Sequence, residues 1–200
     1  MAVAFFGGSV AAYATEHFIF APELEIAYRV RYGKVVTYTT SSIIKPAGVL
    51  QVVPGISKAM WIRLCVENSR WGVAKNCRAY LADVQRQFPN GERDRIFWDC
   101  MPLEWANDSG ATIDIPTGIK GVLDVMRSSI NDEPRPWFVN KGQLDRFDRL
   151  FGTAGTYFLT VLVSADNARA KSCCLQIDWN GEWDQIEVSE AIADWKAEPE

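Results

Sequence analysis

Side chains suited to acid–base or nucleophilic chemistry are scarce in this chain, which has one histidine and five cysteines among 200 residues. Catalytic triads, proton shuttles and many metal sites depend on several such residues. The histidine, His17, lies in an apolar segment far from every polar cluster, so we expect no Ser-His-Asp triad. Carboxylate pairs such as Asp99 with Glu104 are the remaining acid–base candidates, and we expect them to be solvated or salt-bridged. The sequence therefore favours a protein that is not an enzyme.

The spacing of the five cysteines predicts no metal site: they are Cys65, Cys77, Cys100, Cys173 and Cys174. A structural zinc site has paired ligands about two to four residues apart, and here only Cys173 and Cys174 are close. Neighbouring residues of a strand point to opposite faces, so these two are not expected to share a metal. We expect no cofactor and free, mostly buried thiols, which are typical of a reducing compartment. A disulfide between Cys65 and Cys77 is the alternative.

The overall charge argues against a nucleic-acid partner. Lys+Arg 21 against Asp+Glu 25 gives a net charge of -4, so no global positive field attracts phosphate groups. The glycine-rich motifs that bind nucleotide phosphates are also missing from the sequence. The last part of the chain is acidic, and we expect residues 183–200 to form a solvated C-terminal tail.

Aromatic residues supply the candidate binding site. The chain has eight tryptophans, and an indole ring offers a flat apolar face and one hydrogen-bond donor. Two of them fall where core packing does not explain them, on the polar face of a predicted strand and in a predicted turn. The stretch 131–152 reads as a long connection with a charged run, and long loops often carry function. The candidate binding residues are Trp61, Trp71, Trp137, Phe138, Arg146 and Arg149.

The elements that would position these residues are strands, because apolar residues recur with a period of two from residue 59 onward. The stretch 60–67 is a half-buried strand, and 157–164 shows the cleanest alternation in the chain. A change of phase near Ala82-Asp83 indicates a β-bulge. The Asn90-Gly91 and Asn180-Gly181 pairs predict hairpin turns, since a type I′ turn needs positive φ at both central positions. We expect residues 95–105 to form the single strand that returns from the first turn.

The strand and turn pattern predicts an all-β fold. We expect an antiparallel immunoglobulin-like β-sandwich of about seven to eight strands, with a short apolar N-terminal helix or extension. The predicted organisation is an apolar segment at 1–21, a linker with the first strand at 22–57, the sandwich at 58–182 and the acidic tail at 183–200.

Three groups of residues carry a resemblance to a known kind of domain: Ile62–Asn68 with Gly72, Ala74 and Cys77–Leu81 after it, Ile113–Gly118, and Gly155–Val161. They resemble the opening strands, an Ile-Pro-x-Gly turn and a late Gly-x-Tyr-x-Leu strand of bacterial immunoglobulin-like domains of the cell-adhesion-related (CARDB) kind. The resemblance covers about residues 59 to 180 and implies a sandwich used for binding or spacing, without catalytic residues. Two features depart from the family pattern. Gly72 lies further along the chain from Asn68 than the corresponding glycine of the family does, and the stretch 131–152 is longer than the usual connection.

The amino end bears on where the protein is found. Residues 1–15 carry no charge, and the apolar character continues to Ala21. A membrane-spanning helix needs about 20 mostly apolar residues, so 1–21 is a candidate membrane anchor. The alternative is a helix or strand packed on the domain. The first cations after the segment favour the cytoplasm for the following chain. We expect a membrane-associated protein whose folded domain is in a reducing compartment on the cytoplasmic side; a soluble cytoplasmic protein is the alternative.

Two functional hypotheses follow from these features. The first is a non-enzymatic binding or assembly module, tethered to a membrane by residues 1–21, that recognises a protein partner. The second is a carbohydrate-binding sandwich, or a glycan-active enzyme, that uses exposed tryptophans and a carboxylate pair. The oligomeric state and the identity of the partner do not follow from the sequence.

Overall fold

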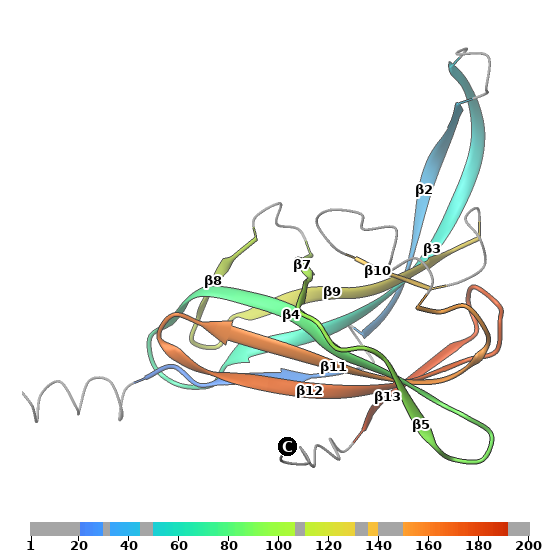
Figure 1. The fold of residues 1–200 in the computed structure, drawn as a ribbon. Coiled ribbons are helices and arrows are strands. Elements are labelled where there is room, and N and C mark those ends of the chain that lie inside the picture. Colours follow the sequence, from blue (N-terminus) through green and yellow to red (C-terminus); the bar gives the residue numbers. More distant parts are fainter. Residues whose placement is uncertain are drawn as a thin grey trace, which may run out of the picture.

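The computed structural model describes residues 21–29, 33–44, 50–106, 111–130, 136–139 and 150–191, with the backbone alone for 38–44 and 50–57. Two antiparallel sheets face each other across a shared core and form a β-sandwich (Figure 1). The predicted all-β class is confirmed. The candidate anchor lies outside the described residues except for Ala21. In the part of the chain that is described, no helix has the length and apolar character needed to cross a membrane.

The first sheet has the strand order β1-β3-β9-β10, and β2 and β7 extend its edges. Its strands are β1 (Leu24–Ala27), β2 (Lys34–Ile44), β3 (Leu50–Asn68), β7 (Glu104–Trp105), β9 (Lys120–Ser129) and β10 (Trp137–Phe138). β1 and β2 follow one another along one edge of β3, whereas β9 occupies the other edge. This sheet therefore contains the longest strand of the described chain, β3, at its centre.

The second sheet has the order β13-β12-β11-β4-β5, with β6 and β8 also paired to β4. Its strands are β4 (Val73–Gln87), β5 (Arg93–Phe97), β6 (Met101–Pro102), β8 (Ile113–Pro116), β11 (Gly155–Ala165), β12 (Ala168–Trp179) and β13 (Ile186–Ala191). The register between β4 and β11 shifts at the predicted bulge, so that Ala82 has no opposite residue and Val84, opposite Leu159, points into the core.

The alternation of side chains places the core as predicted. The inward residues of β3 and β11 are almost fully shielded from solvent: Met60, Ile62, Leu64 and Val66, and Tyr157, Leu159, Val161 and Val163. Burying side chains of this size contributes about 1.5–3 kcal/mol each, which makes this cluster the main stabilising element of the fold. Turns are present at both predicted places, with positive φ at Gly91 and at Gly181, but the predicted type I′ geometry is wrong, because neither Asn90 nor Asn180 has a positive φ.

The predicted boundaries need three corrections. Residues 186–191 are not part of a tail, because β13 pairs with β12 as an edge strand. Residues 22–57 are more than a linker with one strand, because β1 and β2 both pair with β3. The single returning strand predicted for 95–105 is divided into β5, β6 and β7, and Trp98 between them is 71% exposed. Short strands of this kind raise the number in the described chain to thirteen.

A two-stranded arm projects from the first sheet. Residues 50–57 of β3 pair with β2 alone, because β9 pairs only with the later part of β3. Figure 1 shows this part of β2 and β3 extending well beyond the remaining strands.

Candidate binding site

Three strands of the first sheet bring two of the predicted binding residues together. Arg127 of β9 is directly opposite Trp61 of β3 on one side and Trp137 of β10 on the other. The Cζ atom of its guanidinium lies 5.4 Å from the centre of the Trp61 ring and 5.3 Å from that of Trp137. Both distances fall within the range in which a cation is attracted to an aromatic face.

A second guanidinium and the indole nitrogen of Trp61 extend this arrangement of stacked side chains. The Cζ atom of Arg63 lies 5.4 Å from the Trp61 ring, and the Nε1 atom of Trp61 donates a hydrogen bond of 2.9 Å to Thr37 of β2. We call Trp61, Arg63, Arg127 and Trp137 the tryptophan row. All four side chains are half-buried, so their apolar surfaces are covered while part of each remains accessible.

The row lies on the outer face of the first sheet because its residues alternate with core positions. Met60 and Ile62 flank Trp61 and are buried, so the indole between them must point outward. Arg63 also pairs with Asp124 of β9, which it reaches through its Nε atom. Burial raises the pKa of the Asp124 carboxyl, although Arg63 acts in the opposite direction.

The other predicted binding residues are placed elsewhere. Phe138 is 8% exposed and packs in the core with its ring centre 5.2 Å from that of Phe151, so its predicted place on a binding surface is wrong. Its side chain points inward because the neighbouring Trp137 points outward. Arg146 and Arg149 lie outside the described residues. Trp71 is 81% exposed and lies at one end of the sandwich, away from the row.

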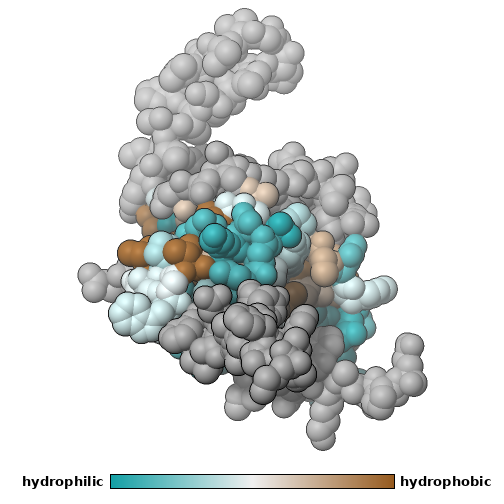
Figure 2. Space-filling model, turned by 90° about the vertical axis from the view of Figure 1, so that its left-hand side faces the viewer, coloured by the Kyte–Doolittle hydropathy of each residue, from teal (hydrophilic) through white to brown (hydrophobic). Residues whose placement is uncertain are grey.

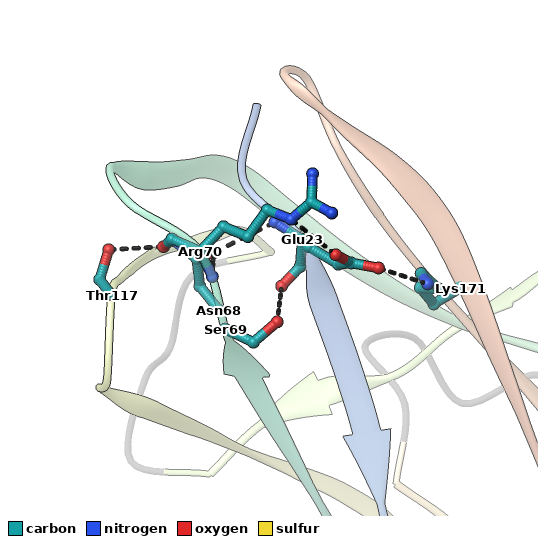
Figure 3. Close-up of polar contacts among 6 residues, drawn as sticks. All are labelled: Glu23, Asn68, Ser69, Arg70, Thr117 and Lys171. Carbon is teal, nitrogen blue, oxygen red and sulfur yellow. Dashed lines mark hydrogen bonds and ion pairs between the residues drawn. The ribbon is translucent and has the colours of Figure 1, made fainter. Parts of the chain in front are cut away.

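Four chain segments meet at that end, which we call the turn end: residues 21–23 before β1, the turns 69–72 and 117–119, and the turn 166–167 (Figure 3). Thr117 joins two of the turns through hydrogen bonds from its Oγ1 atom to the carbonyls of Arg70 (2.6 Å) and Gly72 (2.8 Å). Asn167 joins the third turn to β4, accepting from the Lys75 amide at 2.9 Å.

Asn68 is the fully buried centre of this end. Its Oδ1 atom accepts hydrogen bonds from the amides of Glu23 and Arg70, both at 3.2 Å. Its Nδ2 atom donates to the carbonyls of Gly72 (3.0 Å) and Ile115 (3.3 Å). A buried amide side chain with four partners on three segments fixes their relative positions, because each unmade hydrogen bond would leave a desolvated polar group.

A groove of about 500 Å³ lies at the turn end, lined by three cations and two carboxylates: Arg70, Arg169, Lys171, Glu23 and Asp166. Arg70 and Lys171 reach Glu23 at 2.8 and 3.2 Å. The hydrogen bond from Lys171, together with the charge of Arg70, holds the pKa of the Glu23 carboxyl below its usual range. Figure 3 shows the Glu23 carboxylate between Arg70 and Lys171.

A second hollow of about 560 Å³ lies where β12 and β13 meet, and its charge is mostly negative. Lys34 crosses it and donates to the carbonyl oxygens of Asp184 (3.3 Å) and Ile186 (3.1 Å). Within the described ranges, no group of three or more histidine, cysteine or acidic side chains is arranged to hold a metal ion.

All five cysteines are free thiols, as predicted, and the Cys65–Cys77 disulfide is absent. Burial raises the pKa of Cys77 to about 11 and that of Cys173 to about 12. These thiols therefore stay protonated at neutral pH and are poor nucleophiles. Cys100 is the exposed one of the five.

Three residues of these surfaces were missed by the sequence prediction: Arg127, Glu23 and Lys171. Each acts through a partner distant in the sequence, and strand pairing cannot be read from one sequence at single-residue precision. Asn68 was noticed only within the family resemblance. The available signal for its structural role was a polar residue at the end of the apolar inward series Met60, Ile62, Leu64 and Val66.

Comparison with known proteins adds no relative: no protein-family model matches the sequence, and no curated protein matches it.

Proposed function

We propose that the chain is a non-enzymatic binding module that recognises a protein partner through the tryptophan row. The placement of Arg127 over both Trp61 and Trp137 is the observation that carries this proposal. Tryptophan and arginine are the residues most enriched at the energetic centres of protein interfaces. Held together on one face of a sheet, they offer apolar area and charged donors without a large loss of side-chain freedom on binding.

The same contacts make the carbohydrate hypothesis weaker for this face. A sugar ring binds an indole by stacking on its open face. In the row, guanidinium groups already lie over the rings of Trp61 and Trp137, at distances between 5.3 and 5.4 Å. A partner would instead meet the ring edges and the accessible part of Arg63, whose guanidinium suits the carboxylates and carbonyl groups of a protein surface.

The proposed module is tethered to a membrane by residues 1–21, with the folded domain on the cytoplasmic side. The charge-free stretch 1–15 supports the tether. The free thiols, of which Cys77 and Cys173 have raised pKa values, support a reducing compartment. The likeness to CARDB-type domains, which are binding or spacing modules, supports the same kind of function.

Affinity capture from the native cells tests the proposal with the wild type and three variants of the full chain. Arg127→Gln and Trp137→Ala alter the row. Arg93→Gln is the matched control, because Arg93 stacks on Phe158 of the second sheet with its Cζ atom 3.6 Å from the ring centre. Thermal unfolding verifies that each variant is folded.

We expect one protein to be captured by the wild type and by Arg93→Gln. Its affinity for Arg127→Gln and Trp137→Ala should fall about tenfold or more, which corresponds to about 1.4 kcal/mol. Equal capture by all four forms would overturn the row as the binding site. A tryptophan-fluorescence titration against a glycan panel addresses the other hypothesis, and a saturable response lost in Trp137→Ala would favour carbohydrate.

A further inference from the structure

Two exposed apolar side chains stand at the turn end. Trp71 is 81% exposed, and Ile119 in the neighbouring turn is 57% exposed. The two turns are joined by hydrogen bonds from Thr117, so both side chains are presented on a fixed frame. Exposed side chains of this size cost free energy in water, and a fixed frame keeps them from folding back onto the domain.

Cations gather at the same end of the sandwich. With Lys75, Arg78 and Asp114 beside the groove, the turn end holds five cations and three carboxylates, a net charge of +2. Asp166 is 3.9 Å from Arg78, and Glu23 is paired with Arg70 and Lys171, so both groove carboxylates are already partnered. Figure 2 looks onto this end and shows a hydrophilic centre with a hydrophobic patch beside it.

The chain also enters the sandwich at the turn end. Ala21 and Pro22 line the groove, so the apolar residues 1–20 are joined to the domain at this point. A membrane segment in that stretch would hold this end, rather than the arm or the second hollow, close to the lipid. Tryptophan is the residue most typical of the membrane–water interface, and lysine and arginine are attracted to anionic headgroups.

We infer that the turn end docks on the surface of a bilayer that contains anionic phospholipids. Trp71 and Ile119 enter the headgroup region, and Arg70, Arg169 and Lys171 face lipid phosphates. This contact goes beyond the protein-binding function proposed for the row, and it is separate from insertion of residues 1–21. It fixes the orientation of the domain, with the arm at the end of β3 that is farthest from the lipid (Figure 1).

A bilayer suits this end better than a protein does. A single indole projecting from a turn meets a soft surface without needing a matching pocket, whereas protein interfaces rely on packed clusters such as the tryptophan row. Each cation close to an anionic membrane contributes about 1 kcal/mol, so loss of one cation should weaken binding about fivefold.

The test uses the full chain and vesicles of phosphatidylcholine, alone or with about one third phosphatidylserine. Because residues 1–15 carry no charge, insertion of that segment responds little to headgroup charge. Brominated lipids report depth, since bromine quenches tryptophan fluorescence at short range. The variants are Trp71→Phe and Arg169→Gln. The matched controls are Trp98→Phe, at another exposed tryptophan, and Arg93→Gln, at an exposed arginine of β5.

We expect brominated anionic vesicles to quench the wild type and Trp98→Phe more than Trp71→Phe. Arg169→Gln should weaken the serine-lipid-dependent part of binding about fivefold, and 0.5 M salt should weaken it further. Arg93→Gln should leave it unchanged. Equal quenching of the wild type and Trp71→Phe on bound protein would overturn the inference, whether or not residues 1–21 insert. Binding that is independent of lipid charge and of Arg169 would assign the membrane contact to the tether alone.

Discussion

The tryptophan row and the turn end both present tryptophan, but by different means. Trp61 and Trp137 are half-buried on a flat sheet face and have arginines over their rings. Trp71 stands almost free in water at the tip of a turn. The row depends on strand register, which brings side chains from three strands into line. The turn end depends on a buried polar centre at Asn68, which holds the backbone. Similar residues therefore acquire different roles from the framework that holds them.

Removing the polar centre of the turn end should have the largest effect. Asn68→Ala loses four hydrogen bonds and leaves buried backbone groups unpaired, so we expect the free energy of unfolding to fall by about 3 kcal/mol. Urea denaturation measures this change. Asn90→Ala, in an exposed hairpin turn, is the control and should change stability far less. Similar losses in the two variants would show that Asn68 does not organise the turn end.

Disrupting the row should cost less. Trp61→Ala removes a half-buried ring and should lower the free energy of unfolding by about 2 kcal/mol. A double-mutant cycle with Arg127→Ala should give a coupling energy of about 1 kcal/mol, as expected for a partly desolvated cation–π pair. Denaturation of the four proteins measures it. A coupling energy near zero would mean that the two side chains are neighbours without mutual stabilisation.

Thiol labelling can distinguish damage to the two regions. Cys77 is buried beneath the turn end, opposite Ile113 in the register of β4 and β8, and its raised pKa makes it unreactive. In the wild type we expect Cys100 to react first with a maleimide. Asn68→Ala should speed the labelling of Cys77 several-fold, while Trp61→Ala should not, as read by mass spectrometry of the peptides. Equal rates for Cys77 in both variants would contradict the separation of the two regions.

The smallest expected effects concern pH. The pKa of Glu23 is lowered in the folded protein by Lys171 and Arg70, so its ionised form stabilises the fold above the unfolded pKa of about 4.3. This contribution is lost as the pH falls through the lower folded value. The stability advantage of the wild type over Glu23→Gln should therefore shrink between about pH 5 and pH 3, as measured by urea denaturation at each pH. A constant advantage down to pH 3 would contradict the proposed ion pairing.

Asp124, which lies beside the row, should make stability change with pH in the opposite direction from Glu23. Its folded pKa is raised, chiefly by burial, so the wild type should gain stability relative to Asp124→Asn as the pH falls through that value toward the unfolded one. The same denaturation series measures it. Parallel pH profiles for the two variants would contradict the difference in environment between the turn end and the row.

Much of the fold follows from local patterns in the sequence. The inward faces of β3 and β11 and the bulge at Ala82 were predictable, because alternation and its interruption are local signals. The strand β13 was missed because its acidic composition resembles that of a solvated tail, although Ile186 and Val188 alternate with polar residues. An edge strand carries charges because they discourage pairing with other chains.

The candidate surfaces were only partly predictable. Trp61 and Trp71 were found because a large apolar side chain on a polar face or in a turn is visible in the sequence. Arg127 was missed because its role comes from standing opposite Trp61 and Trp137, which only the register determines. Phe138 was misplaced because β10 has two residues, too few to reveal which face is buried.

Site-specific photo-crosslinking in the native cells tests the central claim most directly, with a photoreactive phenylalanine analogue at position 137 or at position 71. A row that binds protein and a turn end that faces lipid predict a discrete protein adduct from position 137 and a lipid adduct, without a protein adduct, from position 71. The same protein adduct from both positions, or adducts from neither, would contradict the assignment of different partners to the two tryptophan surfaces.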